Sequence, residues 1–188
     1  MVDVPELEFS ERTKRIGILI AVMAAFLAFT EAAGSNASSD ALRGTVEASN
    51  TWAFFQAKTI RMTTLRAQAD ALELSSAEMK AGPALEAMKA RIADWRATAD
   101  RYDSEPDTGE GRKELSVKAK EIETARDNAA AANATYDYAS GALQLGILLA
   151  SAAVVTSLFW LAYLGAGLGV LGVMFGAFGL WAPHVFGG

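Results

Sequence analysis

Apolar and charged positions divide this chain into segments of different character. Ile16 to Ala33 is an apolar run, and Tyr138 to Gly188 contains no Asp, Glu, Lys or Arg, whereas the residues between these segments are rich in charge. A helix that spans a bilayer needs about 20 mainly apolar residues, so the second segment supplies two spans and the first supplies one. The pattern predicts an all-α integral membrane protein with three transmembrane helices and a helical stalk between the first and the second.

The apolar positions of the stalk recur at helical spacing. A helix is expected from about Asp40 to at least Leu74, and Gly82-Pro83 should end it because proline suits the first position of a new helix. The apolar face predicted for the first stalk helix consists of Leu42, Val46, Ala53, Ile60, Ala67, Ala71 and Leu74. The second stalk helix has a heptad seam of Leu85, Met88, Ile92, Trp95, Ala99 and Tyr102.

Residues 103–111 read as a loop, and a third helix should begin near Arg112 and continue into the second span. Its apolar stripe consists of Leu115, Ala119, Ile122, Ala129, Tyr136, Ala139 and Leu143. These three helices predict a stalk packed as a coiled coil or as a three-helix bundle.

The same pattern sets the expected domain bounds. A polar tail covers residues 1–15, the first span 16–36, the stalk 37–139, the second span 140–163, and the third span with the C-terminal tail 164–188. Gly34-Ser35-Asn36 is the expected stop of the first span. The turn between the last two spans is expected at Gly165-Ala166-Gly167, with Trp160 and Tyr163 at one membrane interface and Trp181 at the other.

Composition narrows the range of functions. The 188 residues include no cysteine and a single histidine, His184, so disulfides and thiolate or histidine-rich metal sites are not expected. A net charge of −5 supplies no basic field for nucleic acid. No nucleophile accompanies a base and no glycine-rich phosphate loop is present, so we expect neither an enzyme nor a cofactor.

A tryptophan-centred motif carries a resemblance to a known family. Trp52, Phe55, Gln56, Lys58 and Arg61 lie in the run NTWAFFQAKTIR, and Arg101-Tyr102, KAKE at 118–121 and Tyr138-Ala139 extend the likeness over nearly the whole chain. The sequence resembles the bacterial family catalogued as domain of unknown function 4337. The resemblance implies a bacterial inner-membrane protein with this layout and implies no activity.

The third span carries the most regular pattern of the chain. Gly165, Gly169, Gly172, Gly176 and Gly179 step by 4, 3, 4 and 3 and therefore share one helix face. Glycine lets two helix backbones approach closely, which favours association in lipid. Two alternatives follow: the row packs on the second span of the same chain, or it forms a seam between subunits.

Three smaller features are candidates for a site. Glu31 and Gln144 are polar residues in or near the spans, which makes a conduction or proton role an alternative to simple interfacial placement. The acidic residues of the 103–111 loop partly match the template of a calcium-binding loop, and the alternative is that the loop is a solvated connection between helices. Trp52 and Phe55 with Lys58 and Arg61 form an aromatic and basic patch, favoured as core packing with exposed cations over a lipid-headgroup site.

These observations favour a non-catalytic, self-associating membrane scaffold or tether, with membrane lipid, further copies of the chain and a membrane-protein partner as its expected contacts. The alternatives are a homo-oligomeric channel and an accessory subunit of a larger membrane complex. Arg12, Lys14 and Arg15 directly precede the first span, which predicts a cytoplasmic N-terminus and a periplasmic stalk.

Overall fold

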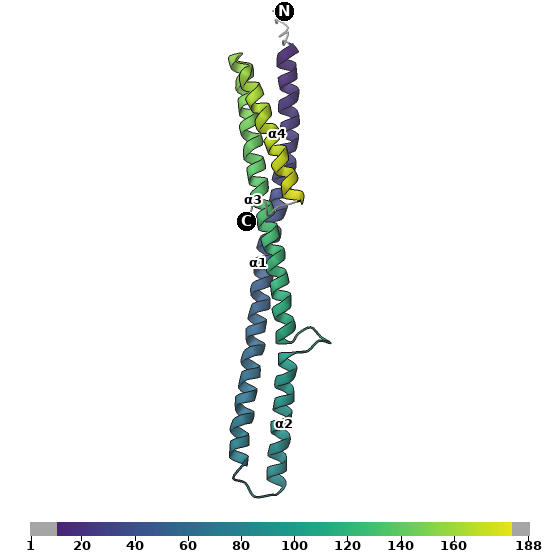
Figure 1. Cartoon of the computed structure of the whole chain (residues 1–188), viewed down its shortest axis with the longest axis vertical. Coiled ribbons are helices and arrows are strands. Elements are labelled where there is room, and N and C mark those ends of the chain that lie inside the picture. The colour runs from purple at the N-terminus through teal and green to yellow at the C-terminus, as the bar shows by residue number, and fades with distance from the viewer. Residues whose placement is uncertain (1–10, 182–188) are drawn as a thin grey trace, which may run out of the picture. The chain divides into compact units, whose positions relative to one another are not determined.

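The computed structural model describes residues 11–181, and α-helices make up most of that part of the chain. They are α1 (Glu11–Ser76), α2 (Pro83–Asp103), α3 (Arg112–Thr156) and α4 (Trp160–Trp181) (Figure 1). Helices α1, α3 and α4 are each long and apolar enough to cross a membrane. The all-α class and the three candidate spans expected from the sequence are confirmed, while His184 lies outside the described residues.

The two breaks between α1 and α3 fall where the sequence places them. Pro83 is the first residue of α2, a position where the missing N–H of proline leaves no intrahelical bond unmade. Residues 104–111 form the second break, in which Gly109 adopts a left-handed φ of 68°. Helix α3 then continues without interruption from Arg112 to Thr156, as predicted.

Helix α1 does not stop at Gly34-Ser35-Asn36, so that prediction is wrong. The helix runs through this segment without a break over 66 residues. Gly34 is buried, and a Cβ there would lie 3.2 Å from the Cβ of Tyr136 on α3. A glycine inside a helix costs only about 1 kcal/mol, and the close helix contact that it permits can offset that cost.

The turn between α3 and α4 also differs from the prediction. It lies at residues 157–159, and Ser157 has a left-handed φ of 58°. The hydroxyl of Thr156 accepts a hydrogen bond from the backbone N–H of Leu158 at 3.4 Å. The segment Gly165-Ala166-Gly167, expected as the turn, is helical, because glycines in a membrane span serve packing as readily as they serve turns.

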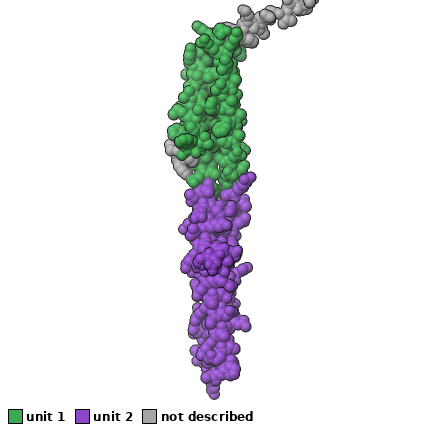
Figure 2. Space-filling model, turned by 90° about the vertical axis from the view of Figure 1, so that its right-hand side faces the viewer, with its two compact units in different colours: residues 1–42, 126–188 green, residues 43–125 purple. Residues whose placement is uncertain are grey.

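The chain divides into two compact units (Figure 2). Unit 1 comprises residues 1–42 and 126–188, and unit 2 comprises residues 43–125. The described part of unit 1 therefore contains the first part of α1, the last part of α3 and all of α4. Unit 2 contains the remainder of α1, all of α2 and the beginning of α3.

In unit 1, α4 runs in the same direction as α1 and opposite to α3 (Figure 1). Met23 of α1 contacts the position of Gly169, and Thr30 contacts that of Gly176. A step of seven residues on α1 thus matches a step of seven on α4. This register places all three apolar segments side by side.

In unit 2, α1 pairs with α2 along one part of its length and with α3 along another. The guanidinium of Arg96 on α2 lies 3.1 Å from Asp70 and 2.6 Å from Glu73 of α1. The indole N–H of Trp52 on α1 donates to Glu123 of α3 at 2.9 Å. Because the described helices meet here as pairs, each helix keeps an outer face away from its neighbour.

The inward faces of α2 and α3 are those predicted from the sequence. Ile92 and Ala99 of α2 are buried, and so are Leu115 and Ala119 of α3. These residues form the apolar seam against α1. Heptad spacing therefore identified the packed face of both helices correctly.

The apolar face predicted for α1 is not its packed face. Every member of that set from residue 46 to residue 74 is exposed. The buried positions of α1 in unit 2 are Ala48, Thr51, Lys58, Met62 and Ala69. Two of these five residues are polar, which is why apolar periodicity selected the opposite side of the helix.

Candidate functional site

The glycine row of α4 forms the packing core of unit 1. Gly165, Gly169, Gly172, Gly176 and Gly179 are all buried. A Cβ at Gly165 would lie 2.6 Å from the carbonyl oxygen of Gly146 on α3, and one at Gly176 would lie 3.2 Å from the Cγ2 of Thr30 on α1. The row therefore packs against α1 and α3 of the same chain, which favours the first alternative, while a seam between subunits stays a prediction.

Glu31 and Gln144, selected separately in the sequence, lie together between α1 and α3. The side-chain amide of Gln144 donates to a carboxylate oxygen of Glu31 at 3.2 Å. Nearby, the hydroxyl of Ser140 bonds that of Thr30 at 3.3 Å, and Thr30 also donates to the backbone of its own helix. The polar residues of two spans thus satisfy one another across the helix pair.

A cleft of about 630 Å³ surrounds this pair, with hydroxyl, amide and carboxylate groups in its wall. Asp137 lies in the same wall and accepts a 3.5 Å hydrogen bond from Asn133. The cleft can hold water or a small polar solute beside the apolar part of the spans. Among residues 11–181, no group of three or more His, Cys, Asp or Glu side chains is arranged to hold a metal ion.

The tryptophan motif lies on the packed side of α1 in unit 2. The rings of Trp52 and Phe55 meet edge to face with centroids 5.3 Å apart. Gln56 and Arg61 are exposed, whereas Lys58 is only 6% exposed. Core packing of the aromatic residues was expected, but the expectation that both cations are exposed is wrong for Lys58.

Lys58 is held between aromatic rings and carboxylates. Its ammonium lies 5.0 Å from the ring centre of Tyr102 and 5.3 Å from that of Phe54, distances suited to cation–π attraction. Glu105 and Glu110 of the 104–111 loop each approach it to 3.9 Å. A buried lysine requires such partners, so Lys58 ties the loop to α1.

Asp103 and Glu114, the two acids that flank this loop, are engaged by neighbouring groups of the chain. Asp103 is bound by Arg112 and Lys113, each at 2.8 Å, and hydrogen bonds from Lys113 in particular hold its pKa below the ordinary value. Glu114 accepts a 2.6 Å hydrogen bond from the hydroxyl of Ser104, and that bond is the largest cause of its lowered pKa. These carboxylates stabilise the α2–α3 connection, which favours the structural alternative over a calcium loop.

The apolar face that the sequence predicted for the first stalk helix is an exposed surface of the chain. We name as the outer stripe the five residues at seven-residue spacing on α1 in unit 2: Val46, Ala53, Ile60, Ala67 and Leu74. Val46 is 61% exposed, Ile60 65% and Leu74 77%. Helix α1 of unit 2 therefore has two periodic faces, one packed within the chain and one open.

Comparison with known proteins identifies the family to which the chain belongs. A family model described as domain of unknown function (DUF4337) matches residues 12–182. The match covers most of the sequence, so the chain belongs to that family. Searches of the curated proteins and of the solved structures give no significant match.

Proposed function

We propose that this member of the DUF4337 family is a non-catalytic scaffold of a bacterial inner membrane, which self-associates through α1 of unit 2. The observation that supports the proposal is the outer stripe, an apolar row exposed to water in the single chain. Self-association would remove that row from water. At about 25 cal/mol per Å² of apolar surface, such burial favours association.

The spacing of the stripe favours another helix as the occupant. Val46, Ala53, Ile60, Ala67 and Leu74 repeat every seven residues, the period that keeps one helix face against a partner in a coiled coil. The flanking positions Ala57 and Ala71 are small and allow close approach. The stripe is therefore better suited to a parallel helix pair than to a compact ligand.

A second copy is the occupant to which the proposal commits. In every copy α1 leaves its span in the same direction, so two copies in one membrane present their stripes in parallel. A twofold axis along the membrane normal then places each residue against its own counterpart. The apolar column is complementary to itself in that arrangement, since Ile60 would meet Ile60.

Cysteine crosslinking tests this arrangement, because the natural chain contains no cysteine. Ile60→Cys, in membranes under mild oxidation, should give a covalent dimer. Gln68→Cys is the matched control: it is exposed on the same helix but points roughly 80° away from Ile60, at about 100° per residue. A dimer from Ile60→Cys alone supports the proposal.

Equal crosslinking at both positions would refute a specific seam, and so would a strictly monomeric mass in mild detergents. Recovery of a second protein in constant ratio, with no dimer of the chain, would instead favour the accessory-subunit alternative. Ile60→Asp should abolish the dimer and leave insertion intact, whereas Gln68→Asp should change neither.

For topology, the proposal places the N-terminus in the cytoplasm and unit 2 in the periplasm. Basic residues close to a span favour the cytoplasmic side, and Arg12, Lys14 and Arg15 lie at the start of the first span. In intact spheroplasts, Asp107→Cys should react with an impermeant thiol reagent and Glu11→Cys should not. The opposite labelling pattern would reverse the assignment.

A homo-oligomeric channel is the second candidate, and the polar cleft around Glu31 and Gln144 is the observation that favours it. Both residues are exposed on the single chain, so several copies could place them around a shared wet axis. Purified protein in planar bilayers would then conduct ions, and Glu31→Gln would alter the cation selectivity. Absence of conductance from an intact oligomer would exclude this candidate.

A further inference from the structure

A groove runs between α1 and α4 in unit 1, and its two ends differ in chemistry. One part has a volume of about 450 Å³ and is lined by Arg12, Arg15 and Tyr163 among others. The other part, of about 320 Å³, is lined by apolar residues such as Phe26 and Val173. Leu19 and Ala166 line both parts, so the two form one continuous groove.

The part of the groove that is lined by Arg12 and Arg15 suits an anionic group. Two arginines lie within one turn of α1, and the guanidinium of Arg12 lies 5.6 Å from the ring centre of Phe159. Among residues 11–181, no Asp or Glu lines either part of the groove. Arginine presents a planar fork of donors that matches a phosphate, and the hydroxyl of Tyr163 adds a further donor at the same end.

The remainder of the groove suits a hydrocarbon chain. From Arg15 to Phe26 the helix rises by roughly 17 Å at 1.5 Å per residue. That length is close to the thickness of one leaflet, about half of a 30 Å hydrocarbon core. The lining is aliphatic and aromatic, and it belongs to segments that are apolar enough to span a membrane.

We infer that this groove binds an anionic phospholipid, with the phosphate on Arg12 and Arg15 and one acyl chain between α1 and α4. A free phosphate would use the arginines but leave the apolar part empty, so the groove selects the lipid form. The inference does not depend on self-association, because every lining residue belongs to unit 1.

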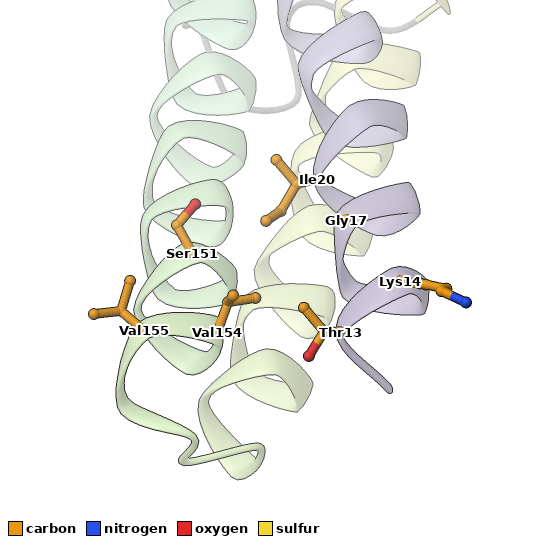
Figure 3. A pocket seen from close by; sticks show the side chains of 7 residues that line it. All are labelled: Thr13, Lys14, Gly17, Ile20, Ser151, Val154 and Val155. Carbon is orange, nitrogen blue, oxygen red and sulfur yellow. The ribbon is translucent and has the colours of Figure 1, made fainter. Parts of the chain in front are cut away.

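A neighbouring groove on the other side of α1 supplies the internal comparison. It lies between α1 and α3, has a volume of about 480 Å³, and includes Lys14 in its lining. Figure 3 shows Lys14 pointing away from Ser151 and Val154. Its ammonium already pairs with Glu11 at 3.0 Å. Lys14 therefore carries the same charge as Arg12 and Arg15 and lies between them in the sequence, but it does not line the groove between α1 and α4.

The test measures binding of phosphatidylglycerol and of phosphatidylcholine to the full chain by native mass spectrometry in mild detergent. The double variant Arg12→Gln/Arg15→Gln should weaken phosphatidylglycerol binding by roughly 30-fold, from about 1 kcal/mol for each basic residue near the surface. Lys14→Gln should change the affinity by less than about twofold, because Lys14 lines the neighbouring groove and not this one. Glycerol phosphate should not compete.

A second variant distinguishes lipid binding in the groove from binding to a charged surface alone. Ala166→Phe keeps both arginines but fills the junction of the two parts, so it should also weaken phosphatidylglycerol binding. Unchanged binding by Ala166→Phe would overturn the inference, and so would an equal loss from Lys14→Gln and from the double arginine variant. Circular dichroism and thermal unfolding identify any variant whose binding loss reflects misfolding, and Ala166→Leu then replaces Ala166→Phe as the groove-filling change.

Discussion

Replacing Gly165 by alanine tests a close backbone contact between α3 and α4 in unit 1. The added Cβ would lie 2.6 Å from the backbone carbonyl oxygen of Gly146 and 3.1 Å from the backbone N of Ala150. Favourable contact between non-bonded heavy atoms is near 3.5–4.0 Å, so α3 and α4 would have to separate by roughly 1 Å. Backbone atoms cannot rotate away as a side chain can, so the whole helix pair must adjust.

The expected cost follows from two opposing terms. Overpacking of a well-packed core costs about 1–3 kcal/mol. Alanine in place of glycine returns up to about 1 kcal/mol of helix propensity, on the scale for water-soluble helices. Gly165→Ala should therefore lower the free energy of unfolding by up to about 2 kcal/mol.

Gly167→Ala is the matched control on the same helix. Gly167 is exposed, and nothing lies within 4 Å of a Cβ built there. This variant should gain the propensity term alone. The stability difference between the two variants therefore isolates the packing term, about 1–3 kcal/mol.

Unfolding of both variants in mixed micelles with increasing SDS, followed by circular dichroism, measures that difference. Equal stability of the two variants would refute close packing of α4 on α3. A Gly165→Ala variant more stable than the natural protein would refute it as well. A lower oligomer mass with unchanged unfolding would favour the alternative in which the glycine row joins subunits.

Three further predictions concern unit 2. Lys113 and Arg112 hold the pKa of Asp103 below its ordinary value, so the stability that these contacts contribute is fully present above the ordinary pKa and is lost as the pH falls through the lowered pKa. Asp103→Asn should remove this contribution to the acid dependence of thermal unfolding, measured between about pH 6 and pH 2. Trp52→Phe removes the 2.9 Å hydrogen bond to Glu123 and should cost about 1 kcal/mol in denaturant unfolding, with unchanged stability contradicting a formed bond. Lys58→Met releases Glu105 and Glu110, so limited proteolysis should cut the 104–111 loop faster, and an unchanged rate would show that the lysine does not hold the loop.

The placement of helices and breaks could be predicted from the sequence because local chemistry decides it. Proline is well tolerated at the first position of a helix, where Pro83 lies, and the acidic, glycine-containing 104–111 loop does not continue a helix. Uncharged segments of sufficient length give candidate spans. The packed faces of α2 and α3 were also predictable, since their inward positions are apolar and periodic. None of these features requires knowledge of a distant part of the chain.

The role of a glycine could not be predicted from the local sequence. Gly34 and Gly165 read as a stop and as a turn, yet both lie inside helices against atoms of a neighbouring helix. Whether a glycine ends a helix or admits a neighbour depends on what packs beside it. That neighbour comes from far along the chain, as Tyr136 does for Gly34.

The composition and order of its apolar and charged segments determined by themselves that this chain is helical and has three candidate spans. The tertiary structure decided which side of each helix is inside. It buried Lys58 and left Ile60 exposed, because aromatic rings and carboxylates from α2 and the loop compensate a charge that periodicity alone assigns to water. It also joined Glu31 to Gln144, since a hydrogen bond between two spans depends on helix register, which no single segment encodes.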